Sequence, residues 1–89
     1  MFVVVEHAIT NPGVFFELAS KAAEAPSGIK VVQFFPSTSK DRAVCLWEAN
    51  SVEAVKGFLE PLSAQSSRNT YYTVDNKTAM GLPTVASAA

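Results

Sequence analysis

The stretch IKVVQFFPSTSKDRAVCLWE, residues 29–48, decides the fold of this 89-residue chain. Residues 29–35 and 42–48 are rich in β-branched and aromatic side chains, which favour strands. The polar segment between them has the composition of a hairpin connection, so we expect two antiparallel strands. Whether Phe35 pairs with Ala43 or with the next residue stays open, and that one-residue choice decides which side chains share a face.

Two predicted helices flank this hairpin, each with one apolar stripe at helical spacing. Asn11 is a natural N-cap for a helix over residues 12–24. Asn50 is followed three residues later by Glu53, which is the pattern of a capping box at the start of the second helix. Pro61 is expected to kink or end that helix.

Two further strands complete the pattern. The first covers residues 2–8 and is rich in valine, and the last covers residues 70–74, after a polar connection at 63–69. The order is β-α-β-β-α-β, which predicts a ferredoxin-like α+β fold with a four-stranded antiparallel sheet and two helices on one of its faces. We expect this domain to span residues 1–75, followed by a partly flexible C-terminal arm at 76–89.

The predicted strands are apolar on both faces, because they lack the alternation of polar and apolar residues that marks a sheet with one wet face. The two helices can cover one face only. A chain of this length buries about 60–70% of its unfolded surface when it folds alone, so it gains from association. We therefore expect a homodimer that forms through the other face of the sheet.

Composition limits the partners and the compartment. Seven Lys and Arg residues against eight Asp and Glu residues give a net charge of -1, so a nucleic-acid partner is not expected. No apolar run approaches the length of a membrane span, and no signal peptide is recognisable. The single Cys45 cannot form an internal disulfide, which suits a reducing cytoplasm. We expect a cytoplasmic protein with no membrane partner.

A ferredoxin-like unit of this length with an apolar free face resembles the dimeric α+β barrel superfamily. The run CLWEAN at residues 45–50 also resembles small uncharacterised bacterial members and their nickel-binding-like relatives. The resemblance covers residues 1–75 and implies two sheets packed across a dyad, with a pocket between sheet and helices in each monomer. The superfamily includes haem-degrading and cofactor-free monooxygenases, lactone isomerases and stress-response proteins.

Haem degradation is the activity of this superfamily that the sequence argues against. His7 and Trp47 match the polar residue and the tryptophan of the haem-degrading type. That type also needs an iron-ligating histidine on the second helix, and residues 51–62 contain none. We therefore expect no cofactor.

Polar residues at the strand ends form the candidate ligand-binding site. Glu6 and His7 end the first strand, and Trp47 and Glu48 end the third. We expect these two strands to lie adjacent and parallel, so that the four side chains gather at one edge near the helix N-termini. Neighbouring residues of a strand point to opposite faces, so Glu6 and His7 share a pocket only if the strand bulges.

Other readings of the same residues are less specific. Glu6, His7, Cys45 and Glu48 carry metal-binding atoms, but no spaced pair fixes a geometry, so no metal site is predicted within one chain. A metal that bridges two chains stays open. Cys45 is otherwise a small buried hydrophobe. Core or dimer interface is the simpler place for the aromatic residues, which are Trp47, Phe34, Phe35, Tyr71 and Tyr72.

Three functions are compatible with this sequence. The first is a homodimer that binds a small, partly apolar molecule. The second is a small enzyme, an isomerase or a cofactor-free monooxygenase, in which His7 or Glu48 acts as acid or base. The third is a structural or assembly protein in which the sheet face and the arm around Met80 are contact surfaces only.

Overall fold

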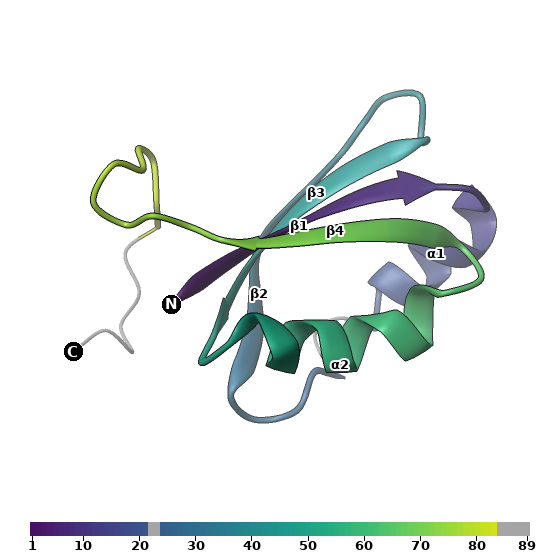
Figure 1. Cartoon of the computed structure of the whole chain (residues 1–89). Helices are drawn as coiled ribbons and strands as arrows, with labels where there is room; N and C mark the ends of the chain where they lie inside the picture. The colour runs from purple at the N-terminus through teal and green to yellow at the C-terminus, as the bar shows by residue number, and fades with distance from the viewer. Residues whose placement is uncertain (22–23, 84–89) are drawn as a thin grey trace.

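The computed structural model describes residues 1–21 and 24–83 and has the predicted ferredoxin-like α+β fold (Figure 1). The last residues of the predicted arm, 84–89, lie outside the described part of the chain. Both helices lie on the same face of a four-stranded sheet (Figure 1). The elements are β1 (Phe2–Ile9), α1 (Pro12–Ala19), β2 (Ile29–Pro36), β3 (Arg42–Ala49), α2 (Val52–Ser63) and β4 (Ser67–Thr73).

The strand order is β2-β3-β1-β4, and every neighbouring pair is antiparallel. The prediction that the first and third strands run parallel is wrong. The crossover through α1 makes β2 parallel to β1, and the β2–β3 hairpin then reverses the direction of β3. As a result, Phe2 lies opposite Glu48 while His7 lies opposite Ala43.

A bulge sets the register of the β2–β3 hairpin. The pairing shifts between Val31, which lies opposite Trp47, and Gln33, which lies opposite Leu46. The extra residue reverses the faces to which the later side chains of β2 point, and Phe35 pairs with Val44. Phe34 therefore faces the helices, and Phe35 faces the other side of the sheet.

Helix α1 ends at Ala19, five residues before the predicted end. The Ser20 hydroxyl donates to the Glu17 carbonyl oxygen at 2.6 Å. In a continuing helix that carbonyl would accept from the backbone N–H of Lys21, which instead donates to Leu18 at 2.9 Å. The serine side chain thus competes with the next helical hydrogen bond and closes the helix with a tighter turn.

Helix α2 is capped by Ser51, one residue later than predicted, and the Ser51 hydroxyl accepts from the backbone N–H of Ala54 at 3.1 Å. The helix continues past Pro61 to Ser63. The missing N–H of Pro61 affects only the exposed Gly57 carbonyl four residues earlier, which water can satisfy. β4 begins at Ser67, three residues before its predicted start.

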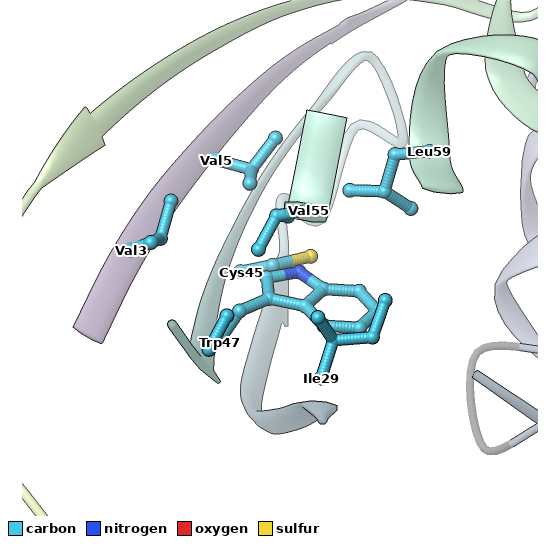
Figure 2. Packing of buried hydrophobic residues seen from close by; sticks show 8 residues of the cluster. Val3, Val5, Ile29, Cys45, Trp47, Val55 and Leu59 are labelled. Carbon is cyan, nitrogen blue, oxygen red and sulfur yellow. The ribbon is translucent and has the colours of Figure 1, made fainter. Parts of the chain in front are cut away.

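The core lies between the sheet and α2 (Figure 2). Eight buried residues form its main cluster, and the Trp47 ring is the largest of them (Figure 2). They are Val3, Val5, Ile29, Cys45, Trp47, Ala49, Val55 and Leu59. The opposite face of the sheet is called the outer face below. It carries an apolar patch of Val4, Phe35, Val44, Leu46 and Tyr72, together with the charged residues Glu6, Lys30, Arg42, Glu48 and Arg68.

Candidate functional site

A cavity of about 110 Å³ lies between the inner face of the sheet and the two helices. Its floor is made by β1, β2 and β3, and its walls by α1 and α2. Leu62, which is 37% exposed, marks the side on which the cavity meets solvent. The lining is almost entirely apolar and consists of His7, Phe15, Leu18, Ala19, Val31, Phe34, Cys45, Trp47, Phe58, Leu59 and Leu62.

His7 is the buried histidine of this cavity, with 4% of its surface exposed. Its ring packs edge to face on Phe15, with the ring centroids 5.0 Å apart. Its Nδ1 lies 2.6 Å from Oδ1 of Asn69, and its Nε2 lies 3.2 Å from Sγ of Cys45. Both ring nitrogens are therefore occupied by protein partners.

Asn69, on β4 opposite His7, holds the imidazole in place. Its amide nitrogen donates to Oε2 of Glu60 at 2.8 Å and to the Ser63 hydroxyl at 2.7 Å. Its oxygen also accepts from the Ser67 hydroxyl at 2.8 Å. A carboxylate can only accept, so the amide nitrogen must face Glu60 and the amide oxygen must face His7.

Glu60 and Tyr71 complete this polar cluster toward the surface. The Tyr71 hydroxyl donates to Oε2 of Glu60 at 2.6 Å. The Tyr71 hydroxyl and the Asn69 amide hold the pKa of Glu60 below its ordinary value. Burial, followed by the bond to Glu60, raises the pKa of Tyr71. The Glu60 carboxylate therefore stays ionised at neutral pH beside a neutral phenol.

Burial keeps both His7 and Cys45 neutral at rest. It lowers the pKa of His7 below 6.5, although the bond to Asn69 and the Glu60 carboxylate partly oppose this effect. It raises the pKa of Cys45 to about 12. Because Nδ1 donates its proton to Asn69, the neutral imidazole has a free lone pair on Nε2, which accepts the Cys45 S–H.

The indole Nε1–H of Trp47 is a buried donor that finds no hydrogen-bond acceptor among the described residues. The ring is 1% exposed and lines the cavity. Figure 2 shows the indole nitrogen on the Cys45 side of the ring. The indole N–H partly opposes the rise that burial causes in the pKa of Cys45, but it makes no hydrogen bond to the sulfur. An unsatisfied buried donor costs about 1–3 kcal/mol.

The structure places the four predicted ligand-binding residues in two pairs, on opposite faces of the sheet. His7 and Trp47 line the cavity, and they lie on neighbouring strands. Glu6 and Glu48 alternate with them and point to the outer face, because β1 shows no bulge in its pairing with β3. His7 and Glu48 are also five residues apart along the sheet, or about 17 Å at 3.4 Å per residue. They cannot act as one acid–base pair.

Two residues of the site were missed at the sequence level. Asn69 lies in the segment 63–69 that the sequence predicts as a polar connection, and no sequence pattern points to Glu60. Residues 67–70 are all polar, so no alternation of polar and apolar side chains marks a strand that starts at Ser67. Only the pairing of β4 with β1 shows that Asn69 lies opposite His7.

The described residues contain no cluster of three or more His, Cys, Asp or Glu side chains suited to a metal ion. None of their helices is long and apolar enough to cross a membrane. The fold and the cavity define a class, that of ferredoxin-like α+β proteins with a pocket between sheet and helices. No family model, characterised protein or solved structure matches the chain.

Proposed function

We propose that this protein binds a small, partly apolar molecule in the cavity between its sheet and its helices. The observation that carries the proposal is the Trp47 indole N–H, a buried donor without an acceptor among residues 1–21 and 24–83, in the wall of a largely apolar cavity. Buried polar groups are nearly always hydrogen-bonded, so this donor is suited to a ligand that carries an acceptor oxygen.

The size of the cavity limits the ligand. A cavity of about 150 Å³ holds a molecule of the size of benzene, and the cavity of this protein measures about 110 Å³. A ligand held wholly inside is therefore no larger than benzene, and a six-membered ring fits only if part of it extends toward solvent beside Leu62. We expect its one carbonyl or ether oxygen to be directed at Trp47. Cyclohexanone has this shape and this single acceptor, and it serves as the probe.

Calorimetric titration with cyclohexanone tests the proposal. We expect saturable binding to the wild-type protein and at least tenfold weaker binding to Ala19→Leu, because Ala19 lines the cavity and the larger side chain fills it. Ala54→Leu is the matched control, since Ala54 lies on the exposed side of α2. Equal loss in both variants, or no saturable binding to the wild type, would contradict the proposal.

The enzymatic alternative is supported less directly. His7 lines the cavity, but both of its ring nitrogens bond to protein groups, so a substrate has no free lone pair or N–H on the imidazole to contact. Glu48 lies on the other face of the sheet. A purely structural role leaves the buried indole N–H without a reason. Binding of a small molecule accounts for more of the observed geometry than either alternative.

We also propose that two chains associate through their outer faces, in the arrangement of a dimeric α+β barrel. On this face Phe35 is 60% exposed, Tyr72 is 49% exposed and Val44 is 37% exposed. A groove of about 430 Å³ runs between these side chains and the arm that carries Met80 and Leu82. Exposed aromatic and aliphatic residues gathered on one sheet face favour association, because burying them removes apolar surface from water.

Light scattering tests the association. We expect a mass of twice 9.5 kDa for the wild type at micromolar concentration. Val44→Lys places a charge on the outer face and should give a monomer. Val14→Lys is a closely matched control, because Val14 is 38% exposed and lies on α1, away from the outer face. A monomeric wild type, or a dimer that survives Val44→Lys, would contradict the proposed interface.

A further inference from the structure

We propose that Cys45 is a nucleophile that adds to small apolar aldehydes in the cavity, with His7 as its base and Asn69 as the residue that positions His7. The inference deepens the proposed function, because it assigns a substrate class to the same cavity. It begins from a linear arrangement of three groups on adjacent strands. Sγ of Cys45 lies 3.2 Å from Nε2 of His7, and Nδ1 of His7 lies 2.6 Å from Oδ1 of Asn69.

The direction of proton transfer follows from the hydrogen bonds around Asn69. Glu60 fixes the amide so that its oxygen faces His7, and His7 must then carry its proton on Nδ1. The lone pair on Nε2 is left to accept the thiol proton of Cys45. A nucleophile within hydrogen-bond reach of a base, which a third group orients, is the general arrangement for nucleophilic catalysis.

The cavity supplies the other requirements of an addition reaction. Cys45, His7 and Trp47 all line it, so a molecule held there lies against the thiol and its base. The Trp47 Nε1–H, turned toward Cys45, is the buried donor available to an oxygen that gains negative charge (Figure 2). Such a donor stabilises a developing oxyanion most where water is excluded.

The proposed step balances without a further reactant. Sγ attacks the aldehyde carbon and forms an S–C bond, while the carbonyl π bond breaks and its electron pair moves to oxygen. The thiol proton moves to Nε2 of His7, giving an imidazolium between Asn69 and the alkoxide. The same proton then passes to the oxygen and leaves a neutral hemithioacetal. An aldehyde is the substrate class because the addition requires no leaving group and no oxidant.

The charges around the site suit a base that is neutral at rest and cationic only during the reaction. Besides Cys45 on β3, His7 faces the apolar Phe15 of α1, the Asn69 amide of β4 and, beyond it, the Glu60 carboxylate of α2. Asn69 and Glu60 both favour the imidazolium, whereas burial opposes it. The imidazolium is therefore accessible as a transient species, and proton transfer accompanies the attack of sulfur.

Carbon-13 NMR of butanal, which is smaller than benzene and is labelled at its carbonyl carbon, tests the proposal. We expect the wild-type protein to give a protein-bound tetrahedral carbon, distinct from the free hydrate, at a stoichiometry of one per chain. Cys45 is the single cysteine, so Cys45→Ala should abolish the signal. His7→Gln should slow its appearance by about 100-fold, which is the range for loss of a general base.

A second measurement keeps the proposal testable if these variants do not fold. In the wild type, the rate of adduct formation should fall as the pH is lowered through the pKa of folded His7, which lies below its ordinary value, because protonated His7 cannot accept the thiol proton. A pH-independent rate, or an adduct that persists in Cys45→Ala, overturns the mechanism. If cyclohexanone binds and the aldehyde forms no adduct, Cys45 is not a nucleophile and the proposed binding function stands. If neither compound binds, both proposals fall.

Discussion

Replacing Asn69 by alanine removes the group that holds His7 in place. In the wild type the Asn69 oxygen accepts from Nδ1 of His7 at 2.6 Å, and its amide nitrogen donates to Glu60 and Ser63. Ser63 keeps its bond to the Leu59 carbonyl oxygen at 2.8 Å, and Glu60 is near enough to the surface to recover water. The Ser67 hydroxyl also loses the Asn69 oxygen as its acceptor. The uncompensated losses therefore fall on Nδ1 of His7, which is 4% exposed, and on the Ser67 hydroxyl, whose residue is 5% exposed.

The expected magnitude follows from these two orphaned donors. Leaving a buried donor without an acceptor costs about 1–3 kcal/mol, so we expect Asn69→Ala to lower the free energy of unfolding by at least about 2 kcal/mol. For a domain of this size, about 2 kcal/mol corresponds to a fall in Tm of roughly 8–16 °C. The pKa of folded His7 should also fall further, because the bond to Asn69 raises it.

Urea denaturation followed by the fluorescence of Trp47, the single tryptophan, measures this change. Wild type and variants are compared at one protein concentration, since association would make stability depend on concentration. Asn76→Ala is the matched control, because Asn76 is exposed, and it should stay within about 0.5 kcal/mol of the wild type. An Asn69→Ala protein as stable as the control would refute the role assigned to the amide.

Three further predictions concern the buried groups and the short helix. Because the pKa of folded His7 is lowered, the unfolded chain binds more protons than the folded chain below pH 6.5. The free energy of unfolding is therefore highest above that pH and falls on acidification by up to about 1.4 kcal/mol per pH unit. An acid titration of stability in which the wild type and His7→Gln run parallel would argue against this assignment. Trp47→Phe removes the orphaned N–H and should abolish any preference for cyclohexanone over methylenecyclohexane, a molecule of the same shape without the oxygen, as calorimetry can show. Ser20→Ala frees the Glu17 carbonyl and should extend α1 by about one turn, visible as slower amide exchange at Lys21; unchanged exchange there would show that the hydroxyl does not end the helix.

The element order could be predicted from sequence because each signal is local. Strand segments rich in valine and aromatics, and the cap at Asn11, depend on neighbours in the chain. The direction of β3 relative to β1 depends on the crossover between them, and taking these strands as parallel moved Glu48 to the wrong end of the sheet. The bulge after Val31 is equally invisible in composition, yet it decides that Phe35 lies on the outer face.

The site was predictable only in part for the same reason. His7 and Trp47 were selected as polar or aromatic residues at strand ends, and both line the cavity. Cys45 lies two residues before Trp47 on the same face, but its contact with His7 comes from the β1–β3 register, which the sequence does not give. Asn69 reaches His7 through the pairing of the first and last strands, across 62 positions of the chain.

The central claim is that the buried indole N–H of Trp47 donates a hydrogen bond to an acceptor oxygen of a small bound ligand. With one tryptophan in the chain, a nitrogen-15 correlation spectrum contains one indole cross-peak, which reports on Trp47 alone. Saturating cyclohexanone should move its proton resonance downfield, as a new hydrogen bond requires, and methylenecyclohexane should not. An indole resonance that stays in place with cyclohexanone, or responds equally to both molecules, would contradict the claim.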